Sequence, residues 1–98
     1  MSYQLKIRDA AEVDLRDAYE YYEECRQGLG QDFVLCVEDS FNKILRNPQH
    51  YPVLHKNIHR TLVKRFPFGI FYVVKENTII VLAVMHGNRN PKKWKIRM

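Results

Sequence analysis

The chain has 98 residues, of which 46% are hydrophobic and 28% are charged, a composition typical of one small globular domain. No apolar run reaches the length of about 18 residues that a membrane-spanning helix requires, so no membrane partner is expected. The N-terminal residues lack the apolar block of a signal peptide, and we therefore expect a cytoplasmic protein.

The charges divide unequally between the two halves of the chain. Residues 1–50 hold six Lys and Arg against ten Asp and Glu, whereas residues 51–98 hold ten Lys and Arg against a single acid, Glu76. The whole chain carries a net charge of +5. If the halves fold to different sides, the basic side would attract an anionic partner, either nucleic acid or an acidic protein segment.

The first 46 residues have the pattern of a strand and two helices. Alternation of apolar and polar side chains over residues 3–8 predicts a half-buried strand. Asp9 and Glu12 have the spacing of a capping box and predict that a helix opens there. The apolar stripe of this helix comprises Ala11, Leu15, Ala18, Tyr19 and Tyr22. Gly28 or Gly30 is expected to end it in a left-handed conformation.

The second helix follows after a very short turn, which predicts an antiparallel helix hairpin. Its apolar stripe comprises Phe33, Val37, Phe41, Ile44 and Leu45. It is expected to end at Asn47, because the residue before Pro48 is pushed out of the helical region. Residues 48–58, which contain two prolines and two histidines, are expected to form a surface loop.

Three strands at hairpin spacing follow, over residues 59–64, 69–75 and 78–86. The last is apolar at nearly every position, so both its faces should be covered and it should be central. The predicted fold is α+β, of order β-α-α-β-β-β, with the N-terminal strand and the antiparallel helix hairpin packed on one face of an antiparallel sheet. Residues 1–98 then form a single domain, and the edge that the first strand joins stays open.

Three segments of this chain resemble the RelE/ParE superfamily of bacterial toxins from type II toxin–antitoxin modules. They are "AAEVDLRDAYEYY", "GLGQDFVLCVEDSFNKILRNPQHYP" and "RTLVKRFPFGIFYVVKENTIIVLAVMHGNRNPKKW". The third is the most telling, because it combines the run at residues 65–68 with Tyr72 and with His86 followed closely by Arg89 and Trp94. The likeness covers almost the whole chain, and the superfamily has the strand–helix–helix–meander fold predicted above.

The resemblance implies a cognate antitoxin whose extended and helical segments wrap the toxin and neutralise it. It also implies one of two targets: RelE-like members cut mRNA in the ribosomal A site, whereas ParE-like members inhibit DNA gyrase and do no chemistry. Leu62 and Gly69 stand where RelE-like members have cationic residues. The expected function is therefore ParE-like inhibition of gyrase. The alternatives are a ribosome-dependent mRNA endonuclease, or a degenerate toxin that only binds its antitoxin.

The resemblance also implies the site residues. Cleavage of RNA through its 2′-hydroxyl needs an acid, a base and cations at the phosphate, and the endonuclease alternative assigns these roles to Arg60, His86 and Arg89. The residues expected to bind the target are Arg60, Lys64, Arg65, Tyr72, Arg89, Lys93 and Trp94. Purely structural roles compete with these: His86 could cap a strand, Arg65 could pair with the acidic helix face, and Trp94 could cover the sheet.

The histidines at positions 50, 55 and 59 raise the question of a metal site. Pro52 and the start of a strand argue against a helix that would align them, and their loop contains no carboxylate or cysteine. We therefore expect no metal and no cofactor. Cys25 and Cys36 lie in separate helical patterns and are expected to be reduced thiols.

Overall fold

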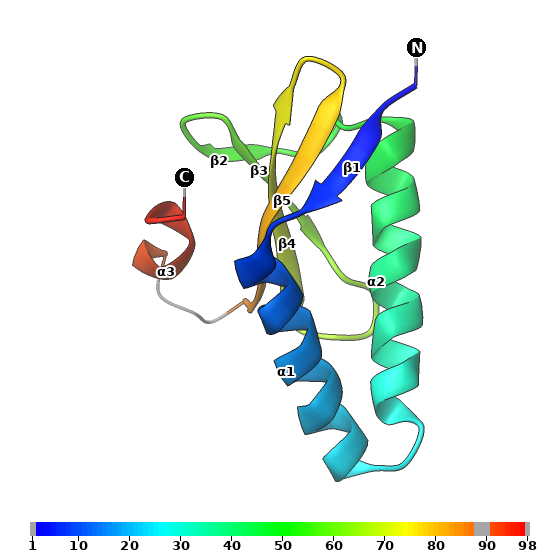
Figure 1. Ribbon diagram of the computed structural model, residues 1–98. Helices are drawn as coiled ribbons and strands as arrows, with labels where there is room; N and C mark the ends of the chain where they lie inside the picture. Colours follow the sequence, from blue (N-terminus) through cyan, green and yellow to red (C-terminus); the bar gives the residue numbers. More distant parts are fainter. Residues whose placement is uncertain (1, 88–90, 98) are drawn as a thin grey trace.

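The computed structural model describes residues 2–87 and 91–97, which form a five-stranded sheet with a helix hairpin on one face (Figure 1). No helix in these ranges is long and apolar enough to cross a membrane. In chain order the elements are β1 (Gln4–Ile7), α1 (Asp9–Cys25), α2 (Leu29–Arg46), β2 (Val53–His55), β3 (Ile58–Leu62), β4 (Phe68–Lys75), β5 (Thr78–His86) and α3 (Lys92–Lys95). The α+β class and the hairpin are confirmed.

The strand order is β1-β5-β4-β3-β2, so the first strand joins β5 at the edge that the sequence left open. The pairing of β1 with β5 is parallel, and the expectation of a purely antiparallel sheet is wrong at this edge. The reason is visible in Figure 1, where the helix hairpin returns the chain to the end of the sheet at which β1 began. The β3-β4-β5 meander then reverses twice, so β5 runs in the direction of β1.

The turn between the two helices is built by two glycines and one carboxylate. Gly28 has a φ of 89° and is the N-cap of α2, so the predicted left-handed glycine opens the second helix rather than ending the first. The carboxylate of Glu23 accepts the N–H groups of Gly28 and Gly30 at 3.0 Å each. A Cβ on Gly30 would lie 2.7 Å from the backbone oxygen of Tyr19, so only glycine allows this close approach of the helices.

Other local predictions need correction. The residue before α1 is Arg8, and no side chain caps the helix, so the capping box formed by Asp9 and Glu12 is absent although the helix begins at the predicted place. The expected loop of residues 48–58 contains the short strand β2, which pairs with β3 at the second edge of the sheet. Because β3 ends at Leu62, Lys64 lies in the turn that follows and not in a strand.

The sheet buries side chains on both faces. The hairpin face contains Phe33 and Tyr72 together with an aromatic cluster in which the rings of Phe33 and Phe66 lie 5.2 Å apart. The opposite face is covered in part by α3, which the expected one-sided packing did not include. Trp94 of α3 stacks on Phe71 of β4 with ring centroids 4.8 Å apart. β5 is therefore covered on both sides, as its apolar sequence predicts.

Candidate functional site

The structure separates the two described residues of the expected catalytic set. Arg60 lies opposite Phe71 in the β3–β4 register, and His86 lies opposite Phe68 in the β4–β5 register. Side chains of paired residues share a face, while successive residues of one strand alternate between faces. Phe71 belongs to the α3 face and Phe68 to the hairpin face. Arg60 and His86 therefore project from opposite sides of the sheet and cannot act on one phosphate.

Contacts of the two side chains agree with the register. The aliphatic stem of Arg60 lies across Gly69, where an added Cβ would be 3.3 Å from the Arg60 Cδ atom. The His86 ring meets Phe68 edge to face at 5.7 Å. At Gly69, where the resemblance implies a cation in RelE-like members, the absence of a side chain leaves space that the Arg60 stem occupies. Arg89, the third residue of the set, lies outside the described residues.

His86 lies in a groove between α1 and α3 that has a volume of about 770 Å³. Asp14 and Asp17 of α1 line one wall, and Lys93 of α3 lines the other. His86 and Lys93 thus line the same groove. The sequence placed only Lys93 among the target-binding residues, so the position of His86 beside it was not expected. The groove presents carboxylates and a cation together, so it can bind a polar segment of a partner but is not a site for a simple anion.

Lys64 and Arg65 occupy the turn between β3 and β4. Arg65 has a positive φ of 73°, and its guanidinium lies 3.9 Å from the Asp32 carboxylate at the start of α2. This contact is the structural alternative predicted for Arg65, since Asp32 belongs to the acidic half of the chain. Both side chains are more than a third exposed, so the pair stabilises the fold by less than about 1 kcal/mol and leaves Arg65 accessible. Lys64 is also exposed.

Tyr72 and Trp94 are buried, and the expectation that they contact a target is corrected on that ground. The Tyr72 hydroxyl donates to the backbone oxygen of Pro48 at 2.7 Å, and its ring stacks on His59 at 5.1 Å. Burial raises the pKa of Tyr72 well above its ordinary value of 10.0. The tyrosine anchors the segment after α2, and Trp94 covers the sheet, which was the structural role predicted for it.

An ion pair that the sequence did not reveal fixes the C-terminal segment. Arg97 donates to both carboxylate oxygens of Asp14, at 2.5 and 3.3 Å, and also to the backbone oxygen of Leu82 at 3.3 Å. Asp14 in turn accepts the backbone N–H of Val84 at 3.0 Å. The two partners are 83 residues apart, so no local pattern could join them. We call this group the Asp14–Arg97 clamp.

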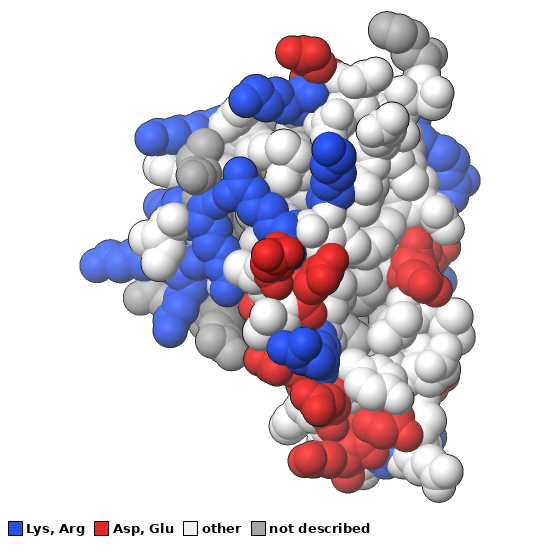
Figure 2. Space-filling view, in the orientation of Figure 1, with Lys and Arg blue, Asp and Glu red and all other residues white. Residues whose placement is uncertain are grey.

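The charges lie on different parts of the visible face. Figure 2 shows Asp and Glu along α1 and at the lower end of the molecule, and Lys and Arg around α3 and the adjoining sheet edge. Two cations of the second half, Arg65 and Arg97, are nevertheless paired with carboxylates of the hairpin. The separation expected from the sequence is thus present around α3 and interrupted at these two contacts.

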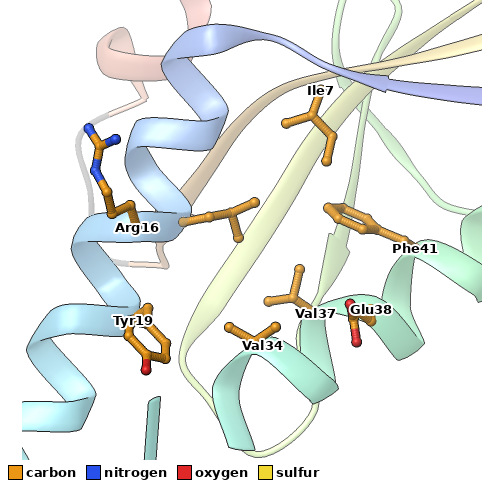
Figure 3. Close-up of a pocket in the computed structure, with 8 residues that line it drawn as sticks. Ile7, Arg16, Tyr19, Val34, Val37, Glu38 and Phe41 are labelled. Carbon is orange, nitrogen blue, oxygen red and sulfur yellow. The ribbon is translucent and has the colours of Figure 1, made fainter. Parts of the chain in front are cut away.

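A second hollow, which was not predicted, lies between the helices. It has a volume of about 430 Å³ and is walled mainly by apolar side chains of α1 and α2, with Ile7 of β1 at its end (Figure 3). Val34, Val37 and Phe41 reach into it from α2, while Arg16 and Glu38 stand beside it. Val37 and Phe41 belong to the predicted apolar stripe of the second helix, whereas Val34 does not. Pattern alone could not show that the two stripes leave an open space.

The described residues contain no group of three or more His, Cys, Asp or Glu side chains placed to hold a metal ion. All three histidines considered for such a site have other contacts, and the His50 ring meets that of Tyr51 edge to face at 5.1 Å. His59 is buried, with its Nδ1 atom 2.8 Å from the backbone oxygen of Tyr51. The His55 ring lies 6.4 Å from the ring of Trp94 on the α3 face.

Comparison with known proteins gives results that agree with this architecture. Residues 5–91 match the model of the family described as the ParE toxin of the type II toxin–antitoxin system parDE. Toxin ParE2 of Mycobacterium tuberculosis is 26% identical over 92 residues, which cover 93% of this chain and 88% of the relative. The same toxin from a second strain of that organism gives the same figures.

Solved structures share the fold at lower identity. A chain of the chromosomal ParDE system from P. aeruginosa has a TM-score of 0.77 and 18% identity, covering 86% of this chain and 95% of its own. A chain of the RelBE2 toxin–antitoxin complex from Mycobacterium tuberculosis has a TM-score of 0.60 and 17% identity, with coverages of 88% and 99%. Because the family model spans nearly the whole domain, this chain belongs to the ParE toxin family of type II toxin–antitoxin systems.

Proposed function

We propose that this toxin inhibits growth by binding DNA gyrase and that it performs no chemistry of its own. The proposal that the toxin performs no chemistry is supported by the placement of Arg60 and His86 on opposite faces of the sheet. An RNA-cleaving site needs its proton-transferring groups and its cations around one phosphate. Membership of the ParE family supports gyrase as the target, and action on gyrase places the protein in the cytoplasm.

The proposed target surface lies at the end of the sheet where β5 stops. Lys64 and Arg65 are exposed in the turn before β4, and Lys93 lines the groove that also contains His86. Arg60 extends this surface on the α3 face, and Arg89, which follows His86 in the chain, stays a proposed contact residue.

A cognate antitoxin is the second proposed partner, since the similar solved structures come from ParDE and RelBE systems. The hollow between α1 and α2 fits the apolar face of an amphipathic helix, because its lining is apolar and its flanks carry Arg16 and Glu38. Burial of that face on binding would cover Val34 and Phe41.

The proposal is tested by adding the purified protein to a gyrase supercoiling assay and to a ribosome-programmed mRNA cleavage assay. We expect wild type and His86→Gln to inhibit supercoiling alike, and neither to cleave mRNA, because the glutamine keeps hydrogen bonding and loses only proton transfer. Arg89→Ala is expected to relieve growth inhibition without loss of fold. Cleavage of mRNA with unaffected gyrase would show an endonuclease. Absence of both activities in a protein that still binds its antitoxin would show a degenerate toxin.

A further inference from the structure

The C-terminal segment carries a group of cations on a fixed support. Lys92, Lys93 and Lys95 are exposed within the single turn of α3, whose remaining residue, Trp94, is buried against the sheet. Arg8 joins them, because its guanidinium donates to the backbone oxygen of Arg97 at 3.0 Å. We call these four cations, Arg8 and the three lysines, the α3 patch. Figure 2 shows Lys and Arg side chains gathered over this part of the molecule.

Contacts that hold this segment against the sheet matter for binding, because a basic C-terminal tail is usually solvated and mobile. Here the Trp94–Phe71 stack and the Asp14–Arg97 clamp hold both sides of the turn. The backbone of α3 is therefore ordered before any partner arrives, which lowers the entropic cost of binding. Of the two carboxylates that line the groove beside Lys93, that of Asp14 is already used by Arg97. Among the described residues no carboxylate, that of Asp17 included, lies within ion-pair distance of Lys93 or Lys95.

The composition of the patch favours phosphate groups over a protein partner. Lysine is depleted in protein–protein interfaces, where tyrosine, tryptophan and arginine supply most of the binding energy. Lysine and arginine are, by contrast, common donors to nucleic-acid phosphates. A DNA duplex places one charge about every 1.7 Å along its axis, dense enough to face several cations from one helical turn.

The surroundings favour a duplex over a single strand. Single-stranded RNA and DNA are held by bases that stack on exposed aromatic rings. Trp94, the ring within α3, and Phe71, the ring on which it stacks, have exposed fractions of 6% and 3%. The exposed ring of Tyr21 lines the groove together with Lys93, but it projects from α1 and not from the turn that carries the lysines. Within the described α3 turn itself no ring is exposed to a base, while the phosphate rows of a duplex require none.

We propose that the α3 patch binds the phosphate backbone of duplex DNA, without sequence preference. This contact goes beyond the proposed binding of gyrase, and it would let the toxin grip DNA held by its target. With about four phosphates neutralised, the logarithm of affinity should fall with the logarithm of salt concentration at a slope of about −3.6. The affinity would then drop about 150-fold between 50 and 200 mM KCl.

The test measures fluorescence anisotropy of a short labelled duplex with the purified protein and no gyrase, so its outcome does not depend on the gyrase proposal. The test variant changes Lys92, Lys93 and Lys95 to glutamine, which leaves one cation and an expected affinity loss of only about 3.5-fold over the same salt range. Its matched control removes three hairpin cations, Arg26, Lys43 and Arg46, also as glutamine. We expect the control to keep the wild-type salt dependence.

Three results would overturn the proposal. The first is a test variant that keeps the wild-type salt slope while its circular dichroism spectrum shows an intact fold. The second is a control that loses as much binding as the test variant, because the contact would then reflect net charge alone. The third is tighter binding of a single-stranded RNA of equal length than of the duplex. All three lysines are exposed, but the Nζ atom of Lys95 lies 5.8 Å from the centroid of the Trp94 ring, so near-ultraviolet circular dichroism is recorded as well to check that this ring keeps its place.

Discussion

The Asp14–Arg97 clamp gives the sharpest prediction about stability. Asp14 has a side chain that is only 16% exposed, and it serves two partners: the guanidinium of Arg97 and the backbone N–H of Val84. Replacing Asp14 with alanine removes the acceptor for both. Replacing Arg97 with alanine removes only the guanidinium and leaves the bond from Val84 to Asp14 in place. The two single substitutions should therefore differ in cost.

The magnitudes follow from these contacts. Leaving the Val84 N–H unpaired costs about 1–3 kcal/mol, and a hydrogen bond to a charged group contributes about 1.5–3 kcal/mol. We expect Asp14→Ala to lower the free energy of unfolding by about 3–5 kcal/mol, the range for one lost partner of a buried ion pair. Arg97→Ala should cost about 1–2 kcal/mol, because the side chain is 25% exposed and water can replace part of it. The double variant should show a coupling of about 0.5–3 kcal/mol.

Urea unfolding followed by far-ultraviolet circular dichroism measures these values, provided that the slope with urea stays constant among the variants. Asp14→Asn is the matched control, because its amide oxygen still accepts from Val84 while the charge is lost; its cost should fall close to that of Arg97→Ala. Equal costs for Asp14→Ala and Arg97→Ala would refute the second role of Asp14. A cost below about 1 kcal/mol for Asp14→Ala would refute the clamp altogether.

Two further predictions concern the core. Tyr72→Phe should cost about 1–3 kcal/mol, because the buried oxygen of Pro48 loses its donor. Burial raises the pKa of Tyr72 in the folded state, so the contribution of its neutral hydroxyl to stability is fully present below pH 10.0 and is lost as the pH rises further. Urea unfolding below and above this pH should therefore show that the wild type loses more stability with rising pH than Tyr72→Phe does. Gly30→Ala should cost about 1–3 kcal/mol in thermal unfolding, since its Cβ would meet the backbone of Tyr19 at 2.7 Å. Gly87→Ala, whose nearest contact would be an ordinary 3.6 Å, should stay within about 0.5 kcal/mol, and a similar loss in both would contradict the close approach.

The elements could be predicted because their signals are local. The alternation in β1, the stripes of the two helices and the uninterrupted apolar run of β5 reflect which side chains must leave water. The failures were also local in origin. The short strand β2 follows a segment with two prolines, which favoured a loop, and it pairs with β3 across the two-residue turn at Lys56 and Asn57. The missing cap at Asp9 shows that the spacing of a capping box permits the bond without requiring it.

The candidate site could be predicted only as a set of residue types. The departures at Leu62 and Gly69 pointed away from RNA cleavage, and the structure adds that Arg60 and His86 face opposite ways. Register decides this, because one residue of shift or one bulge moves a side chain to the other face of a sheet. The β4–β5 pairing contains such an irregularity between Phe71 and Tyr72.

The sequence by itself determined the order of the six main elements, the burial of β5 and the unequal charge of the two halves, because hydrophobic periodicity and charge are properties of neighbours along the chain. Only the tertiary structure decided that β1 pairs in parallel, that the basic tail is fixed by Trp94 and the Asp14–Arg97 clamp, and that two of the cations meet hairpin carboxylates. Those contacts join residues that are far apart in the chain, and their energy depends on distance, burial and direction in space, which no local pattern carries.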